Sequence, residues 1–140
     1  MRIDNILSKW QLVPLYFALD TVGNSVTDSA LFTTDANASA SLNLGYTMPF
    51  DGEIIAISAN LSAAASTGTL TIDATDDTVA TTDPSVVITT ETAASDVCNR
   101  GTNLFDADAV IGASYTTTGW NGTASDLQVI VWVLLKVAAI

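Results

Sequence analysis

The chain has 140 residues, with 15 Asp and Glu, only 4 Lys and Arg, no His and a net charge of −11. That length fits one domain with a substantial core, and the charge argues against a nucleic-acid partner, because phosphate contacts need clustered cations. The absence of His excludes His-based acid–base catalysis, serine-type triads and most zinc sites. An acidic composition fits a protein that stays soluble at high local density, such as many copies on one surface.

The first nine residues predict an N-terminal arm, followed by a single β-sandwich domain over residues 10–140. Apolar residues of the arm recur at roughly helical spacing, so a helical turn or two is possible. A frayed terminus and an arm that docks onto a neighbour are both open, and the apolar content favours docking. No apolar stretch is typical of a signal peptide. The docking interpretation assigns contacts with a neighbouring molecule to Arg2, Ile3, Ile6, Leu7, Lys9 and Trp10.

Residues 10–20 form an apolar and aromatic segment with Pro14 in its middle. Proline cannot donate a ladder hydrogen bond, so this strand is expected at a sheet edge or at a bulge. Residues 21–38 are polar and predict a surface loop. Residues 39–46 alternate apolar and polar side chains and predict a strand.

The centre of the chain predicts a β-hairpin. Residues 53–61 alternate with Ile55, Ile57, Ala59 and Leu61 on one face, and residues 69–75 alternate with Leu70, Ile72 and Ala74 on one face. This period of two is typical of strands with one buried face. The small-residue segment 62–68 ends in Gly68, which can adopt the positive φ that a chain reversal needs.

The following segments predict shorter strands and loops. Residues 77–84 and 91–103 are expected as surface loops, the second containing Cys98 as a partly buried thiol. A single cysteine allows no intrachain disulfide. Residues 86–90 and 109–117 are expected as strands, the latter with Ile111, Ala113 and Tyr115 on one side. Residues 118–122 predict a turn.

The last strand, residues 127–137, is apolar on both faces. Leu127, Val129, Val131, Val133 and Leu135 form one face, while the other carries Ile130, Trp132 and Leu134. A sandwich strand of a monomer normally has a polar outer face. Either the N-terminal segment covers the second face, or Ile130, Trp132 and Leu134 form an oligomer interface centred on the tryptophan. The run is too short to span a bilayer and ends at Lys136.

No motif predicts catalysis, a cofactor or a metal. Asp106 and Asp108, or Asp76 and Asp77, are sequence neighbours, whereas glycoside hydrolysis needs carboxyl groups that face each other across a cleft. Asp73, Asp76 and Asp77 supply oxygen ligands of the kind that calcium takes, but EF-hand spacing is absent and a solvated acidic loop explains them better. We therefore expect no enzyme activity, and a function that resides in surfaces.

The chain resembles small β-sandwich proteins of tailed bacteriophages, namely decoration (cement) proteins and head or tail spikes. The resemblance rests on PFDGEIIAISANLS and GTLTIDAT, followed by FDADAVIGASYTTTGW and an apolar last strand, and covers residues 45–135. It implies an antiparallel, jelly-roll-like sandwich. It further implies a structural protein on the outer capsid surface that binds the major capsid protein as a homotrimer, with the N-terminal arm and Trp10 as its contact with the capsid. The alternative is a receptor- or glycan-binding module using Tyr115, Trp120 and Asn121.

Overall fold

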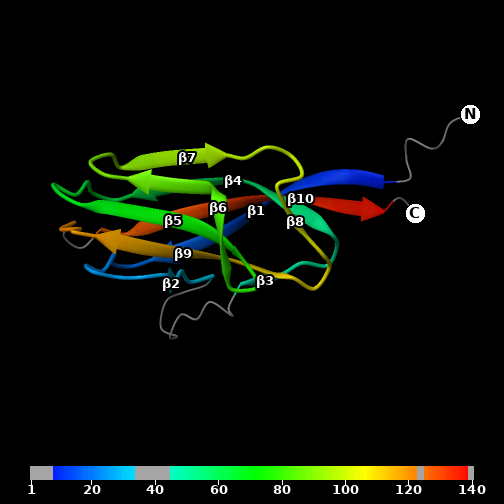
Figure 1. Cartoon of the computed structure of the whole chain (residues 1–140), viewed down its shortest axis with the longest axis horizontal. Helices are drawn as coiled ribbons and strands as arrows, with labels where there is room; N and C mark the ends of the chain where they lie inside the picture. Colours follow the sequence, from blue (N-terminus) through cyan, green and yellow to red (C-terminus); the bar gives the residue numbers. More distant parts are fainter. Residues whose placement is uncertain (1–7, 34–44, 123–124, 139–140) are drawn as a thin grey trace, which may run out of the picture.

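The computed structural model describes residues 8–33, 45–122 and 125–138, and within them the protein is all β (Figure 1). Two five-stranded antiparallel sheets face each other. No helix able to cross a membrane occurs in these ranges. The strands are β1 (Ser8–Leu19), β2 (Ser29–Ala30), β3 (Tyr46–Thr47), β4 (Gly52–Leu61), β5 (Thr69–Asp76), β6 (Val79–Ile88), β7 (Ala93–Val97), β8 (Asn103–Phe105), β9 (Val110–Thr118) and β10 (Leu127–Ala138).

The strand order is that of a jelly roll. Sheet A runs β1-β10-β4-β7, with β8 also paired to β4, and sheet B runs β2-β9-β5-β6, with β3 also paired to β9. β2 and β3 both pair with β9, and β7 and β8 both pair with β4. If each such pair is counted as one strand, each sheet has four strands, as in a jelly roll. The predicted fold class, an antiparallel jelly-roll-like sandwich, is confirmed.

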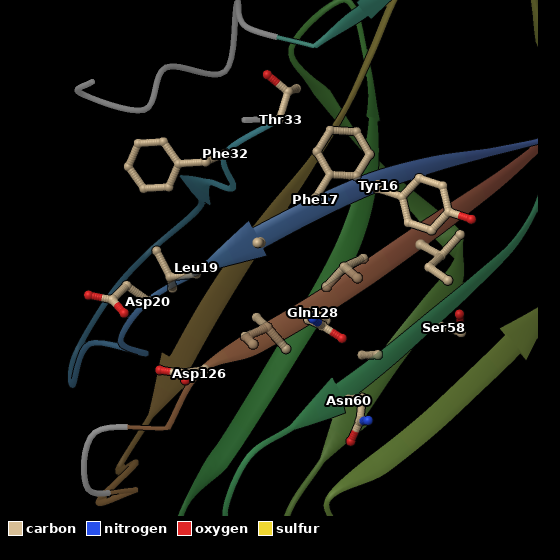
Figure 2. A pocket seen from close by; sticks show the side chains of 15 residues that line it. Tyr16, Phe17, Leu19, Asp20, Phe32, Thr33, Ser58, Asn60, Asp126 and Gln128 are labelled. Atoms are coloured by element: carbon tan, nitrogen blue, oxygen red, sulfur yellow. The ribbon is translucent and has the colours of Figure 1, made fainter. Parts of the chain in front are cut away.

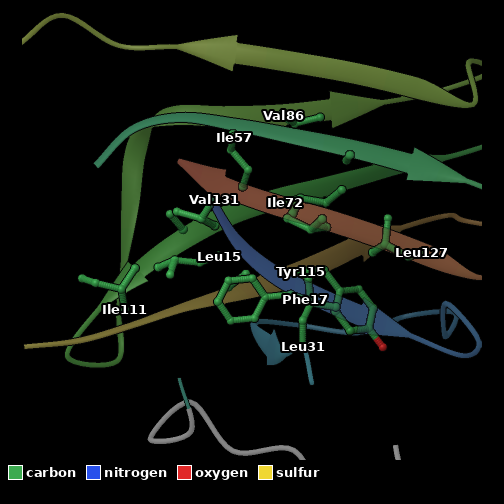
Figure 3. Close-up of a cluster of buried hydrophobic side chains, with 14 of the residues drawn as sticks. Leu15, Phe17, Leu31, Ile57, Ile72, Val86, Ile111, Tyr115, Leu127 and Val131 are labelled. Atoms are coloured by element: carbon green, nitrogen blue, oxygen red, sulfur yellow. The ribbon is translucent and has the colours of Figure 1, made fainter. Parts of the chain in front are cut away.

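A single hydrophobic core lies between the sheets (Figure 3). Sheet A contributes the predicted inward row of β10, from Leu127 to Leu135, whose members are at most 7% exposed. Sheet B contributes Ile72 of β5 and Ile111 and Tyr115 of β9, all buried. The predicted inward faces of residues 69–75, 109–117 and 127–137 are therefore confirmed, because period-two alternation reports directly on one buried face.

The predicted hairpin between residues 53–61 and 69–75 is wrong. β4 lies in sheet A and β5 in sheet B, so segment 62–68 crosses from one sheet to the other. Both strands alternate because they cover the same core from opposite sides, and alternation cannot distinguish that arrangement from pairing. Gly68 has a φ of 89°, and a Cβ there would lie 2.3 Å from the carbonyl oxygen of Gly119. The glycine thus permits two turns to pack closely.

The hairpin in this region joins β5 to β6 instead. Asp76 pairs with Val79, and the two turn residues Asp77 and Thr78 have φ values of 46° and 77°. Two consecutive positive φ angles are typical of a type I′ hairpin turn, which Asp tolerates. The Asp77 carboxylate accepts a hydrogen bond of 2.8 Å from the backbone N–H of Val110. The predicted loop over 77–84 is therefore largely strand.

Two further predictions need correction. β7 and the first residue of β8 lie inside the predicted loop 91–103, because β7 is a short edge strand whose sequence has little β preference. In β4, the register against β10 shifts between Trp132 and Val133. Ile54, rather than Ile55, is consequently buried in the core at 1% exposure. A bulge of this kind changes which face a side chain occupies.

The N-terminal strand is at the edge of sheet A, as Pro14 predicts. β1 pairs with β10 along its length, while the only bridge on its other side is Ala18 with Phe32 in the described part of the chain. The strand begins at Ser8, so Lys9, assigned to the arm by sequence, belongs to the sheet and pairs with Val137. Residues 1–7, with most of the predicted arm, and most of the predicted strand 39–46 lie outside the described residues.

Candidate interaction surface

The outer face of sheet A carries large apolar side chains that the described part of the chain leaves exposed. In β1, Trp10 is 45% exposed, Leu12 51% and Tyr16 59%. In β10, the predicted interface residues Ile130, Trp132 and Leu134 are half-buried on the same face. Contiguous apolar surface of this kind marks interaction sites more often than free surface.

The register of β1 on β10 unites two sites that sequence reasoning kept apart. Trp10 lies opposite Lys136, Leu12 opposite Leu134, and Tyr16 opposite Ile130. The predicted capsid-contact residue Trp10 therefore belongs to the same face as the predicted oligomer interface. Lys9 is exposed, but it follows the opposite alternation in β1 and is not part of this face. Arg2, Ile3, Ile6 and Leu7 lie outside the described residues.

Among the described residues, the N-terminal segment does not cover the apolar second face of β10. β1 lies beside β10 within the sheet and is hydrogen-bonded to it, so it extends the apolar face instead of covering it. Together, β1 and β10 form the apolar middle of the face, composed of Leu12, Trp132 and Leu134.

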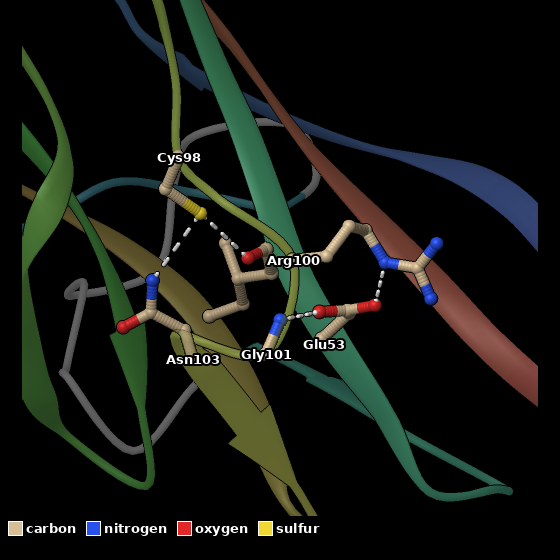
Figure 4. Close-up of polar contacts among 6 residues, drawn as sticks. Glu53, Cys98, Arg100, Gly101 and Asn103 are labelled. Atoms are coloured by element: carbon tan, nitrogen blue, oxygen red, sulfur yellow. Dashed lines mark hydrogen bonds and ion pairs between the residues drawn. The ribbon is translucent and has the colours of Figure 1, made fainter.

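An ion pair that sequence analysis did not find lies at one end of this face (Figure 4). The Glu53 carboxylate is 1% exposed and accepts hydrogen bonds from Arg100 Nε and from the backbone N–H of Gly101. The Arg100 guanidinium also lies over the Trp10 ring, with its carbon 4.7 Å from the ring centroid. Arginine suits both contacts, because its planar group can stack and donate at once. Its side chain remains 56% exposed.

We call Trp10, Arg100 and Lys136 the cationic end of the face. Arg100 and Lys136 are two of the three cationic residues that the structure describes. The third, Lys9, is next to Trp10 in β1, where strand alternation directs its side chain to the other face. A protein with a net charge of −11 thus carries two of its described cations at one end of this face. A sequence signal for this end is a Glu within a predicted strand, Glu53, and an Arg within a predicted loop, Arg100. The sequence does not specify that the two residues pair.

Next to the ion pair, Cys98 is a structural residue. Its thiol is buried, lies 3.2 Å from the carbonyl oxygen of Ile54 and is contacted by the Asn103 side chain (Figure 4). Burial raises the pKa of the Cys98 thiol above its ordinary value. A reactive cysteine needs a lowered pKa, so the interpretation of Cys98 as an inert, buried thiol agrees with its surroundings.

A groove of about 700 Å³ lies at the opposite end of the same face (Figure 2). It crosses the ends of β1, β10 and β4. Polar side chains from these strands, including the cross-strand pair Gln128 and Asn60, line it together with Tyr16, Ile130 and Phe32. Asp20 and Asp126 also line it, and both are exposed. The groove is therefore amphipathic and acidic.

A second acidic region lies where the β5–β6 turn meets the β8–β9 loop. Asp76, Asp77, Asp106 and Asp108 line a depression of about 380 Å³. Burial, and then the charges of Asp77 and Asp106, raise the pKa of Asp76. In the described ranges, no group of three or more His, Cys, Asp or Glu side chains has the arrangement to hold a metal ion. Asp73, considered with Asp76 and Asp77 for calcium, has a pKa raised chiefly by burial.

The residues considered for glycan binding are not a surface site. Tyr115 is 5% and Trp120 2% exposed, so both rings belong to the core. Asn121 is exposed, but its side-chain oxygen accepts hydrogen bonds from the backbone N–H groups of Ser66 and Thr67. These three residues fold the turn 118–122 onto the sandwich.

Comparison with known proteins finds a similar fold in a chain of a bacteriophage capsid structure. No family model matches the sequence, and no curated protein matches it. The structure aligns with a chain in the acidic stable capsid structure of Helicobacter pylori bacteriophage KHP30, at a TM-score of 0.53 and 8% identity, over 93% of this chain and 98% of that chain. It also aligns with chains of the cyanophage Pam1 capsid asymmetric unit (TM-score 0.48, 10% identity, 91% and 86% covered) and of Desmodium yellow mottle tymovirus (0.43, 10%, 95% and 90%). At these identities the likeness establishes the fold alone.

Proposed function

We propose that the chain is a structural, non-enzymatic protein of a bacteriophage virion, and that it decorates and stabilises the outer surface of the capsid. The observation that carries this proposal is the outer face of sheet A, where Trp10, Leu12 and Tyr16 are about half exposed beside Trp132 and Leu134. Exposed aromatic and aliphatic side chains of this size are typical of the centre of a protein interface. A jelly roll shared with a chain of a phage capsid structure supports the same proposal.

In this proposal the protein acts as a homotrimer that binds the major capsid protein and clamps neighbouring capsid subunits. The arm residues Arg2, Ile3, Ile6 and Leu7, together with Lys9, provide contacts to the capsid. Ile130, Trp132 and Leu134 lie between copies of the chain, together with Trp10, which the register of β1 on β10 places on the same face. An acidic surface elsewhere keeps many neighbouring copies soluble before they attach.

Binding to capsids tests the proposal. Purified protein is mixed with capsid particles that lack it, from the virus that encodes the chain, and particles are recovered by sedimentation. The expected result is saturable binding of many copies per particle, and a particle that withstands heating better than the undecorated one. Absence of saturable binding by folded protein contradicts the proposal. Trp132→Ser should reduce binding, whereas Val87→Ser on the outer face of sheet B serves as the control.

A further inference from the structure

The outer face of sheet A is complementary to itself in charge as well as in apolar character. Its cationic end and its acidic groove lie on the same face, on either side of the apolar middle. Trp10 and Ala18 are eight residues apart along β1, or about 27 Å at the usual strand rise. A face organised in this way presents both halves of one contact.

The donor half is preorganised. Of the five N–H donors that a guanidinium carries, only that on Nε of Arg100 has a partner among the described residues. Glu53 and the Trp10 ring hold the group in place, and its terminal nitrogens remain available. A charged group fixed in advance loses little conformational entropy on binding. The ligand that such a planar fork recognises best is a carboxylate.

The acceptor half is the groove. The register of β1 on β10 ends with Leu19 opposite Leu127. Asp20 directly follows β1 and Asp126 directly precedes β10, so both lie at the rim of the groove. Neither carboxylate has a hydrogen-bond or salt-bridge partner within residues 8–33, 45–122 and 125–138. The groove volume of about 700 Å³ offers room for an aromatic side chain with a guanidinium stacked on it.

We propose that the cationic end of one copy docks into the groove of a second copy, with Arg100 donating to Asp20 and Asp126 of that copy. The contact places the apolar middle of each face, around Trp132, against that of its neighbour. Donor and acceptor lie at opposite ends of one face, so two copies packed face to face each give one contact and receive one about a two-fold axis. Such a pair is distinct from a three-fold contact within a homotrimer. This inference rests on the proposed function, because it specifies how copies of the decorating protein hold one another.

The available area supports a second copy as the occupant. β1 and β10 have twelve residues each, β4 has ten and β7 has five. At the usual strand rise and a spacing of about 4.8 Å they give a face of roughly 600 Å², which is at the lower end of the share of one partner in a stable interface. A parallel argument comes from charge. The net charge of −11 repels a second copy overall, so two copies attract each other only where the cations of one meet carboxylates of the other, which is what this docking provides.

A double-mutant cycle on self-association tests the contact. The donor variant, Glu53→Gln with Arg100→Gln, removes both charges of the ion pair, so neither charge is left without its partner. The acceptor variant is Asp20→Asn with Asp126→Asn. We expect each variant to weaken the self-association constant, measured by analytical ultracentrifugation, by roughly tenfold, the effect of a close interfacial charge pair. The combination of both variants should weaken it by no more than either does alone, because the two changes remove one shared contact.

The matched control is Asp106→Asn with Asp108→Asn, which removes the same two negative charges outside the face. It should leave association unchanged or slightly tighter, because it lowers the overall repulsion. Urea unfolding of every variant confirms that the domain is folded. The inference would be overturned by a wild type that is monomeric at 100 μM. It would also be overturned if the two reductions of the association constant multiplied in the combined variant, or if the control weakened association as much as the acceptor variant. Saturable capsid binding that persists in those cases leaves the proposed function standing.

Discussion

Leu12 and Val87 form a matched pair that separates an interface from an ordinary apolar surface. Leu12 is 51% exposed on the outer face of sheet A, and Val87 is 53% exposed on the outer face of sheet B. Replacing either residue with Ser removes a similar amount of apolar surface from the free domain. The two variants should therefore have similar stability as isolated domains, since surface substitutions are usually within about 0.5 kcal/mol.

The association constant distinguishes the two positions. Full burial of a leucine side chain stabilises by about 1.5–3 kcal/mol, so burying the exposed half of Leu12 against a neighbour contributes about 0.8–1.5 kcal/mol. Leu12→Ser should weaken association roughly four- to tenfold for each contact in which Leu12 is buried. Val87→Ser should leave it unchanged.

Sedimentation velocity over a concentration series from 1 to 100 μM measures this difference directly, with urea unfolding at a concentration where the protein is monomeric as the stability control. Equal shifts for Leu12→Ser and Val87→Ser would refute the assignment of the interface to sheet A. A wild type that stays monomeric throughout would do so as well.

Further predictions concern the domain itself. The Glu91 carboxylate accepts hydrogen bonds from the backbone N–H groups of Thr89 and Thr90 and from the Thr89 hydroxyl, which lower its pKa to about 2. An NMR titration should therefore place its midpoint near pH 2. Because a depressed folded-state pKa contributes stability that is present above the ordinary value of 4.5 and lost as pH falls toward 2, Glu91→Gln should flatten that part of the stability profile. The pKa of Asp76 is raised, so its charge opposes folding at neutral pH. Asp76→Asn should raise the melting temperature at pH 7, with the gain vanishing below pH 3.8. Gly68→Ala should cost at least about 1–2 kcal/mol in urea unfolding, from the positive φ alone, and more from the contact with Gly119. Reagents that modify thiols should label Cys98 only at the rate at which the native domain opens, and fast labelling would contradict its burial.

Alternation along single strands was sufficient to predict the inward residues of β5, β9 and β10. It did not predict which strands pair, because a strand in either sheet of a sandwich buries one face against the same core. The error on β4 and β5 has this origin. The type I′ turn at Asp77 and Thr78 was missed for another reason: neither residue is glycine, although Asp tolerates positive φ.

The interaction surface was predictable in part. The apolar second face of β10 and the aromatic N-terminal strand each indicate an interface in the sequence, and Pro14 indicates an edge. Their union on one face depends on the register of β1 against β10, which no local pattern specifies. The Glu53–Arg100 pair joins residues 47 positions apart. Such a contact follows from the bulge in β4 and the path of the β7–β8 connection, both of which are tertiary features.

The most direct test of the proposed function is the number of copies in the virion. Under this proposal the chain is a component of a bacteriophage particle, and quantitative mass spectrometry of that purified particle compares its peptides with those of the major capsid protein. A protein that decorates the capsid lattice should be present in hundreds of copies per particle. A few copies, or a few dozen, would indicate a vertex spike or tail component, and absence from the particle would contradict a structural role in the virion.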